Sequence, residues 1–553
     1  MSVLVRVRSF STHDFPGQEV CNVARKNCGS ILLMVCGILL CGTSARAGEA
    51  TLHPSLQRAT AFAAGRVSSS SLQVAPTRLL NRPIAQAPSS EFNLIYHVAG
   101  IGYPSFAGGS PPNSTLAVGP TEVVQAAQGV YSDFNKSTGA IIPLNGQNFT
   151  FGNTVWRLLL PGSLCGNSND DNGELIVKFD RDAQRWILLQ NQYDPPYAVC
   201  LAVSQTATFA DNLWYAYQFP TVQGKIADYT KLGVWSTGGQ SDGYYQAWNA
   251  FSNGFVGAVI CGYDRAKLLA GDRSAEQICF QLTQNDAYLL PADRDSPVRP
   301  PATEDEFFIG SVGEVDNSHL SVYSMHINNW STGDATITGL NNSQLIAVAP
   351  YNETCGLIPQ INGGTIQALC DRLLYRFAYW DDQPSPTVTA APPIPPPLQH
   401  WLVNHSVATS GGQVGVRWYE FIAAHRSVPV NSLSVFQQDT YTGSPSDLSY
   451  RWMASIARDN VQDILLGYSV SSSSTDPSIA VSGRKYSDAL STLSGEQYSV
   501  MGPAPGDPHW GQYTTMEIDP SDNCTFFYTN EYYQLFSNDW STDISSWKFP
   551  NCH

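Results

Sequence analysis

The chain has 553 residues, of which only 14% are charged, while 44 are Gly, 35 are Pro and 11% are aromatic. This composition is typical of many short strands joined by turns, so it favours an all-β protein over a helical bundle. The formal net charge of −16 argues against nucleic acid as a partner and against tight binding to anionic membranes, since both require clustered Lys and Arg.

The N-terminal residues show the pattern of an export signal. Arg25 and Lys26 precede the apolar run Ile31–Leu40, and Ala45 and Ala47 place small residues where a signal peptidase reads them. The alternative is a membrane anchor, but this run is about half of the roughly 20 apolar residues that cross a bilayer core. We therefore predict a signal peptide at 1–47, a flexible leader at 48–91, no membrane span, and a secreted or periplasmic protein.

Cleavage after Ala47 leaves eight cysteines, an even number: Cys165, Cys200, Cys261, Cys279, Cys355, Cys370, Cys524 and Cys552. In an oxidising compartment they predict up to four disulfides, and pairing of neighbours along the chain is the simplest arrangement, as in Cys261 with Cys279 and Cys355 with Cys370. The sequence has neither C-x-x-C nor H-E-x-x-H, so we expect no metal site of those kinds.

A hairpin pattern repeats along the chain. Tyr450–Ala457 and Ile464–Ser471 are rich in β-branched and aromatic residues and flank a polar turn, and 175–189 and 513–528 show the same pattern. Comparable turns recur about every 60 to 80 residues, which suits a β-propeller of six or seven blades over 92–553. The Pro-rich stretch 384–398 is interpreted as an insertion between blades, with a domain linker as the alternative.

Several phrases of the sequence resemble a family of secreted bacterial proteins whose propellers are similar to the sialidase and BNR-repeat group. The phrases are Pro111–Pro120, Asp228–Trp235, Asp242–Tyr245, Arg451–Ile456, Gly467–Ser472, Trp510–Tyr513 and Tyr528–Tyr532. The resemblance implies a propeller fold and export, not an activity. The chain departs from the family at Asn113 and Gln512, which are amides where carboxylates are usual, whereas Glu174 and Asp228 keep acidic groups at corresponding positions.

Polar residues at the starts of inner strands and in long loops are the candidate site residues, because loops at one rim form the usual site of a propeller. A sialidase-like mechanism needs a tyrosine activated by a glutamate, an acid, and an arginine cluster for a substrate carboxylate. The catalytic candidates are Glu531, Tyr513 and Asp242, and the substrate-binding candidates are Arg417, Arg451, Arg484, Trp510 and Asp228. Alternatively, the arginines pair with turn aspartates or stack on the adjacent Trp and lock blades together.

Glu531 lies among aromatic residues near the end of the chain, so we expect its pKa to be raised unless Arg451 or Arg484 pairs with it. No cofactor is expected. The acidic stretch 170–174 is the segment that could bind Ca²⁺, although a solvated turn is the favoured interpretation.

Two functions remain open from the sequence. One is a secreted glycosidase that acts on extracellular glycans with rim carboxylates, and the other is a non-catalytic propeller that binds a glycan or a cell-surface protein.

Overall fold

The computed structural model describes residues 52–67, 91–103, 105–106, 109–160, 162–167, 174–312, 316–339, 345–361, 364–382, 397–425, 430, 432–444, 446–534 and 540–553. The expected signal peptide, most of the Pro-rich insertion and the acidic stretch before Glu174 lie outside these residues. The described part is mostly antiparallel β-sheet, which confirms the all-β expectation. Its helices are short: α1 Asn153–Trp156, α2 Leu164–Asn167, α3 Arg265–Ala270, and 3₁₀ turns at Phe209–Asp211 and Val222–Gly224.

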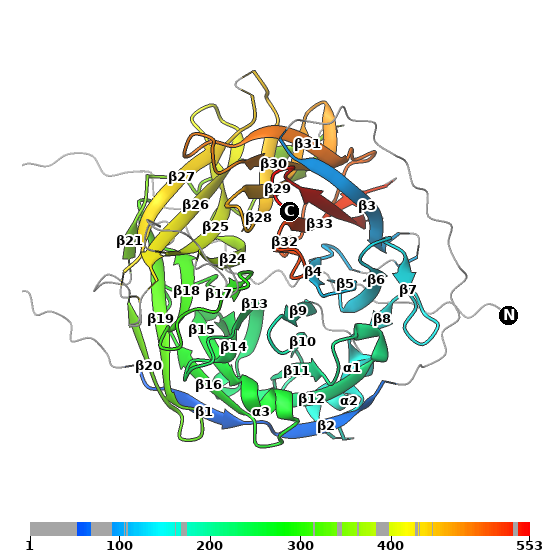
Figure 1. Cartoon of the computed structure of the whole chain (residues 1–553), viewed down its shortest axis with the longest axis vertical. Helices are drawn as coiled ribbons and strands as arrows, with labels where there is room; N and C mark the ends of the chain where they lie inside the picture. Colours follow the sequence, from blue (N-terminus) through cyan, green and yellow to red (C-terminus); the bar gives the residue numbers. More distant parts are fainter. Residues whose placement is uncertain are drawn as a thin grey trace, which may run out of the picture. The chain divides into compact units, whose positions relative to one another are not determined.

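Seven inner strands follow one another around a common centre (Figure 1). They are β4 Thr115–Val118, β9 Ile176–Asp180, β13 Ile226–Trp235, β17 Leu290–Arg294, β24 Leu374–Asp381, β28 Tyr450–Arg458 and β32 Thr515–Ile518. Each contacts the next, and β32 contacts β4. Strands β17 and β24 are also hydrogen-bonded in parallel. This closed order fits a β-propeller.

Further antiparallel strands extend outward from each inner strand. From β4 to β17 they are β5 Glu122–Ala127, β6 Val130–Asn135, β7 Ile141–Ile142, β8 Thr150–Phe151, β10 Arg185–Gln192, β11 Ala198–Ser204, β12 Leu213–Pro220, β14 Gly243–Phe251, β15 Phe255–Asp264, β16 Glu276–Gln281, β18 Glu306–Ser311, β19 His319–Asn329, β20 Asp334–Gly339 and β21 Leu345–Ala347. From β24 onward they are β25 Leu398–Ala408, β26 Val414–Ala424, β27 Ser434–Tyr441, β29 Ile464–Ser472, β30 Thr475–Arg484, β31 Ser494–Val500, β33 Thr525–Tyr533 and β34 Trp540–Lys548. A separate two-stranded sheet pairs β22 Ile358–Pro359 with β23 Thr365–Ile366.

Strands from the N-terminal part complete three of these sheets. β3 Asn93–Gly102 pairs with β34, so the last sheet combines both parts of the chain. β1 Ser55–Arg58 pairs with β16, and β2 Ala61–Arg66 pairs with β12. A leader without regular structure was expected at 48–91, and residues 55–66 differ from this expectation because unpaired edges of β16 and β12 offer them main-chain partners.

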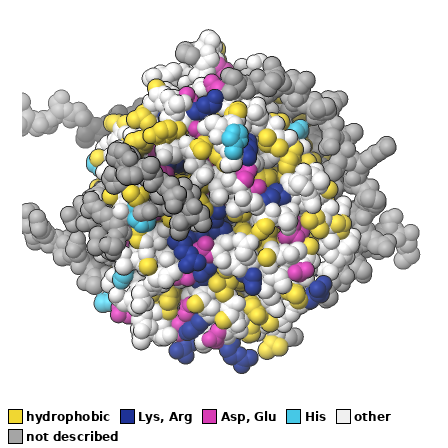
Figure 2. All heavy atoms as spheres, in the orientation of Figure 1, with side chains coloured by type: hydrophobic (Ala, Val, Ile, Leu, Met, Phe, Trp, Pro, Cys, Tyr) yellow, Lys and Arg dark blue, Asp and Glu magenta, His cyan; other side chains and the backbone are white. Residues whose placement is uncertain are grey.

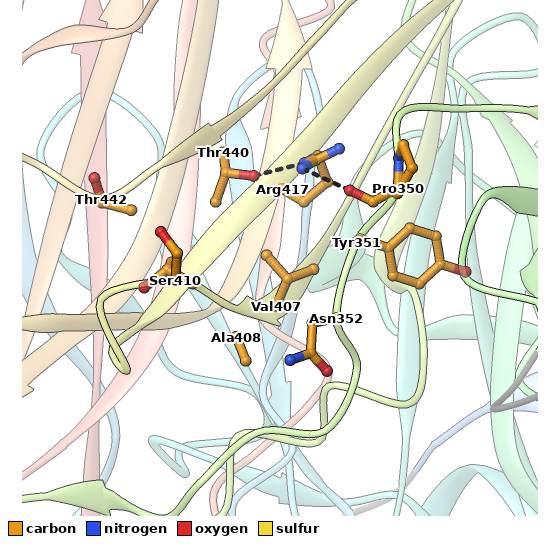
Figure 3. Close-up of a pocket in the computed structure, with 10 residues that line it drawn as sticks. Pro350, Tyr351, Asn352, Val407, Ala408, Ser410, Arg417, Thr440 and Thr442 are labelled. Atoms are coloured by element: carbon orange, nitrogen blue, oxygen red, sulfur yellow. Dashed lines mark hydrogen bonds between the residues drawn. The ribbon is translucent and has the colours of Figure 1, made fainter.

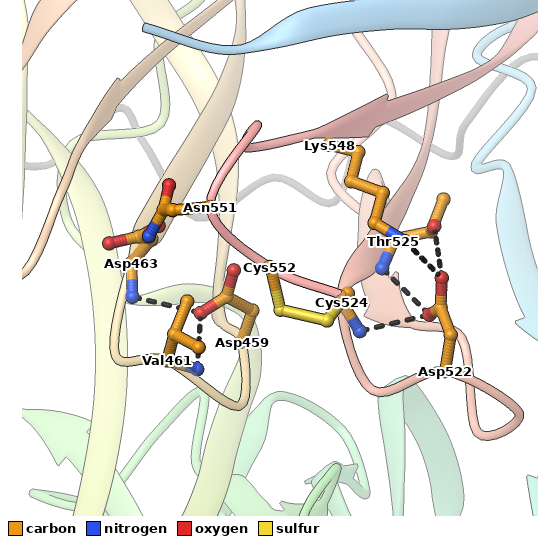
Figure 4. The surroundings of a disulfide bond; sticks show 9 residues. All are labelled: Asp459, Val461, Asp463, Asp522, Cys524, Thr525, Lys548, Asn551 and Cys552. Atoms are coloured by element: carbon orange, nitrogen blue, oxygen red, sulfur yellow. Dashed lines mark hydrogen bonds and ion pairs between the residues drawn. A yellow bond between two sulfur atoms is a disulfide. The ribbon is translucent and has the colours of Figure 1, made fainter.

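Apolar side chains fill the space between the sheets. Aromatic residues dominate the largest fully buried positions, as in Trp235, Trp248 and Trp418. Four disulfides join neighbouring cysteines: Cys165–Cys200, Cys261–Cys279, Cys355–Cys370 and Cys524–Cys552. The predicted pairs Cys261–Cys279 and Cys355–Cys370 are thereby confirmed. Figure 4 shows Cys524–Cys552 fastening the C-terminal residues to the turn between β32 and β33.

Candidate functional site

One end of the inner-strand ring gathers charged and aromatic side chains. Glu174 precedes β9, Asp228 and Lys231 lie in β13, Arg372 precedes β24 and Tyr513 precedes β32. The neighbouring inner strands β17 and β24 run parallel, and ring and charge contacts between these residues show that the strand starts meet at one end. We call Glu174, Asp228, Lys231, Arg372 and Tyr513, together with the surrounding Tyr193, Tyr229 and Tyr288, the mouth cluster.

A β-bulge in β13 shapes the centre of this cluster. The pairing register with β14 shifts between Asp228 and Lys231, and Tyr229 in between has a φ of 54°. Such a left-handed conformation is strained for a bulky residue, and bulges that redirect side chains are frequent beside active sites. The Lys231 Nζ lies 3.0 Å from the centre of the Tyr513 ring and 3.6 Å from that of Tyr229.

Lys231 is a buried amine in this cluster. Its Nζ has no hydrogen-bond partner among the described residues, and its side chain is fully buried. Burial lowers the pKa of Lys231 well below its usual range, with Glu174 opposing the shift. The two rings and the nearby carboxylates are therefore its main electrostatic support.

Two half-buried carboxyl groups lie beside the amine. The Tyr193 hydroxyl donates to Glu174 Oε2 at 3.0 Å. Burial and the charge of Asp228 raise the pKa of Glu174 to about 7. Burial also raises the pKa of Asp228, while the Tyr229 N–H and Lys231 oppose this shift. At neutral pH Glu174 therefore exists in both protonation states, which is the condition for an efficient acid or base.

Arg372 contacts two tyrosine rings of the cluster, those of Tyr229 and Tyr288. It makes a two-point ion pair with Asp371, at 2.9 and 2.8 Å, and its guanidinium lies 3.7 Å from the centre of the Tyr288 ring. Its Nη1 also donates to Gln512 Oε1 at 3.2 Å. The Gln512 N–H in turn donates to Asn113 Oδ1 at 3.3 Å. The two amide positions singled out in the sequence thus meet each other beside the mouth cluster.

Glu531 and Trp510 hold the segment that precedes Tyr513. Glu531 Oε2 accepts a hydrogen bond from the Gly511 N–H at 3.0 Å, while Oε1 has no hydrogen-bond partner among the described residues. Burial raises the pKa of Glu531 well above its usual range. No ion pair in the described structure joins it to the expected Arg451 or Arg484. Trp510 is buried against Trp452 and donates to Ser469 Oγ at 3.0 Å.

Asp242, a catalytic candidate, lies far from Asp228 of the mouth cluster. It follows the end of β13, whereas Asp228 lies near the start, and about 3.3 Å per residue separates them by on the order of 20 Å. Its carboxylate pairs with Arg265 at 2.9 Å. Asp242 is therefore an ion-pair partner at the opposite end of the inner strand.

The three candidate arginines do not form a cluster. Arg451 is held by Glu496, at 2.7 and 2.9 Å, and by Asp447 at the start of β28. Arg484 lies level with the end of β28 and donates to Asp488 O at 2.9 Å. Arg417 lies in another sheet, on β26. The expected arginine cluster is corrected accordingly, because strand direction places these residues at different ends and in different sheets.

A second charged group, which sequence reasoning missed, lies inside the ring. Lys178 contacts Asp293 at 2.5 Å and also Glu517, and Arg376 contacts Asp293 and Asp295 at 2.6 Å each. Charged residues within the otherwise apolar strands β9, β17, β24 and β32 are the only sequence signal for it. On the molecular surface, Figure 2 shows other Lys, Arg, Asp and Glu side chains near the middle of the drawn face, whereas Lys178 and Arg376 are buried.

No protein-family model and no curated protein matches the chain. Among solved structures, the chain is similar to a periplasmic gluconolactonase of Pseudomonas aeruginosa, with 11% identity, a TM-score of 0.34, and 81% of this chain and 96% of that chain covered. It is also similar to the Hadza microbial sialidase Hz136, with 10% identity, a TM-score of 0.33 and 91% of each chain covered. It is similar to the polysaccharide lyase Uly1 as well, with 10% identity, a TM-score of 0.34, and 90% of this chain and 100% of that chain covered. Values this low carry no argument about function.

Proposed function

We propose that this protein is an exported seven-bladed β-propeller that hydrolyses glycosidic bonds of extracellular glycans at the mouth cluster. Seven blades follow if each inner strand begins one blade, with the parallel β17 and β24 joining two blades into one sheet. Export is supported by the four disulfides, which persist in oxidising compartments. No helix in the described ranges is long and apolar enough to cross a membrane.

The observation that carries the proposed reaction is the pair of half-buried carboxyl groups, Glu174 and Asp228. Glycosidases use two carboxyl groups, one protonated and one ionised. The pKa of Glu174, raised to about 7 by burial and by Asp228, suits the group that donates a proton to the leaving oxygen. Asp228 is the second carboxylate, and Lys231 and Arg372 favour its ionised form.

The tyrosine rings provide the walls for a sugar. Tyr193 and Tyr288 are partly exposed beside the carboxyl groups, and such rings combine an apolar face with a hydroxyl, while the buried rings of Tyr229 and Tyr513 pack behind them. In hydrolysis the glycosidic C–O bond breaks and Glu174 gives its proton to the leaving oxygen. Water adds its hydroxyl to the sugar carbon and gives its other proton to the ionised Asp228, from which it returns to Glu174 through solvent. The amides Asn113 and Gln512 favour the alternative function, glycan binding without turnover, because they add hydrogen bonds but no acid or base.

A hydrolysis screen and a glycan array with the same purified protein test the proposal. Glu174→Gln and Asp228→Asn are expected to lower turnover roughly 10²- to 10⁴-fold with an unchanged melting temperature. Asp334→Asn, on the exposed edge strand β20, is the matched control and should keep full activity. Full turnover by Glu174→Gln overturns the proposed role of this residue. Glycan binding without turnover by the unaltered protein establishes the binding function instead.

A further inference from the structure

A pocket with a cavity volume of about 390 Å³ lies outside the mouth cluster, between β25, β26, β27 and the segment that follows β21 (Figure 3). Its wall consists of Pro350, Tyr351, Asn352, Val407, Ala408, Thr409, Ser410, Arg417, Thr440 and Thr442. This volume is near the lower end of the range of volumes, roughly 300–1,000 Å³, found for pockets that bind small molecules. We call it the Arg417 pocket.

The walls of the Arg417 pocket are held on both sides by hydrogen bonds. Toward β19, the Tyr351 N–H donates to Asn317 O at 2.9 Å, and its hydroxyl donates to His319 O at 3.2 Å. Toward β25, the Ala408 N–H donates to Asn352 O at 2.8 Å. The pocket is thus preformed, which reduces the ordering cost of binding a ligand.

Arg417 gives this pocket a positive charge. Among the described residues no ion pair joins its guanidinium to a carboxylate, although its charge opposes the burial that raises the pKa of Asp439. Its Nε donates to Thr440 Oγ1 at 2.6 Å, and its Nη1 and Nη2 donate to the carbonyl oxygens of Ala349 and Pro350 at 3.2 and 3.5 Å. The wall contains no acidic residue. Asp439 pairs with Trp418, so strand alternation directs its side chain to the face opposite Arg417. The protein is acidic overall, which makes this local charge distinctive.

The remaining wall suits a sugar more than a simple ion. Hydroxyl groups of Thr440, Thr442 and Ser410 and the amide of Asn352 offer hydrogen bonds, while Tyr351 and Val407 add apolar surface. Below them, burial and the charge of Arg417 lower the pKa of His405 to about 3, so this neighbour adds no charge. We propose that the Arg417 pocket binds the carboxylate of an acidic sugar unit.

The pocket is separate from the mouth cluster but lies toward the same end of the ring. Asn404 of β25 pairs with Leu374 at the start of β24, so Val407 and Ala408 extend beyond that start, toward Arg372. Arg417 is two strands outward from β24, or about 10 Å at roughly 4.8 Å per strand. The proposal is independent of catalysis at Glu174.

Calorimetric titration of the full-length protein tests the proposal with glucuronate, glucose and inorganic sulfate. Glucuronate is expected to bind at least about tenfold more tightly than glucose or sulfate, and Arg417→Gln should remove this advantage. Thr442→Val should weaken glucuronate binding severalfold. This second variant tests the pocket if Arg417→Gln folds poorly. Arg185→Gln is the control, since Arg185 is likewise a partly buried arginine that donates to main-chain oxygens but lies outside the pocket, and it should change nothing.

Three results overturn the proposal: no binding of glucuronate, equal binding of glucuronate by Arg417→Gln in a folded state, or binding of sulfate as tight as that of glucuronate. Glu174→Gln should leave the affinity for glucuronate unchanged, which separates this pocket from the mouth cluster. Inactivity of the protein in the hydrolysis screen has no bearing on this result.

Discussion

Several carboxyl groups of this protein are buried without a cation beside them. Glu531 and Asp133 have raised pKa values because burial penalises their charged forms. Glu420 is also buried, but His400 and Arg458 outweigh burial and lower its pKa to about 2. Burial alone therefore does not decide the protonation state, and the nearest cation decides whether a carboxyl group can donate a hydrogen bond or a proton.

Glu531→Gln should keep turnover within a few-fold of the unaltered protein and leave the melting temperature nearly unchanged. The Gln amide oxygen can accept from the Gly511 N–H, and its NH₂ replaces the protonated oxygen. Glu531→Ala leaves that N–H without a partner, which costs about 1–3 kcal/mol and loosens the segment that precedes Tyr513. Thermal melts together with kcat and KM check both variants. A loss of 10²-fold or more in turnover by Glu531→Gln would instead support the acid/base role expected from the sequence.

Asp133→Asn should stabilise the protein at pH 8 but not at pH 4. Burial and the charge of Glu122 raise the pKa of Asp133 from 3.8 to about 9, so the folded state binds more protons than the unfolded state between these values. The free energy of unfolding therefore falls as pH rises from about 4 to 9. The Asn variant removes this dependence, and its melting temperature at pH 8 should rise by on the order of 5 °C. Melting temperatures of the two proteins at several pH values check this prediction. The same dependence of melting temperature on pH in both proteins would contradict it.

At the scale of strands, local patterns predicted the hairpins well. The expected strands Tyr450–Ala457 and Ile464–Ser471 are β28 and β29 within one residue at their C-terminal ends, because alternation and a polar turn specify both locally. The family phrases also contain Asp228, Gln512 and Tyr513, and the comparison with the family pointed to Glu174 as a corresponding acidic position. The structure has these four residues at one end of the ring. The bulge at Tyr229 and the buried Lys231 were missed, since nothing in the local sequence marks a register shift. The prediction that the three arginines form a cluster was wrong, because their positions depend on strand direction and on the sheet to which each strand belongs.

Deleting residues 53–67 should lower stability only modestly, whereas deleting residues 93–102 should lower it strongly. The first deletion removes β1 and β2, half-exposed strands that cover two sheet edges. The second removes β3, whose Ile101 is buried and donates through its N–H to Gln125 at 2.7 Å. Melting temperature and light scattering check the two proteins, and exposed edges should make the first more prone to association. Equal losses of stability would contradict this ranking.

At the scale of the molecule, disulfides join cysteines that lie 15 to 35 residues apart, and ion pairs join more distant parts of the chain. The described cysteines all form disulfides, so the native protein should show no reactive thiol from Cys165 onward. Reduction should lower the melting temperature, since loss of one native bridge typically costs about 2–5 kcal/mol. Thiol labelling with mass spectrometry before and after unfolding counts the free thiols, and thermal melts with and without reductant measure the change in melting temperature. Several thiols that react in the folded protein would contradict the four-bridge structure.

The charges inside the ring connect four of its inner strands. Lys178 of β9 contacts Asp293 of β17 and Glu517 of β32, and Arg376 of β24 contacts Asp293 as well. Removing one member leaves a buried charge without its partner, which is strongly destabilising, whereas replacing both members of a pair is tolerated far better. These contacts therefore help to fix which strands lie next to each other.

Lys178→Met should lower the free energy of unfolding by about 3–5 kcal/mol, because Glu517 then remains buried without its cation. Glu517→Gln in the same chain should restore part of this loss, since the Gln side chain carries no charge. Lys548→Met, which breaks a more exposed pair with Asp522, is the matched control and should cost at most about 1 kcal/mol. Denaturant unfolding of the unaltered protein, Lys178→Met, Glu517→Gln alone, the double variant and Lys548→Met measures these differences. If the double variant is as unstable as the sum of its single variants, the charges act independently and do not join the inner strands.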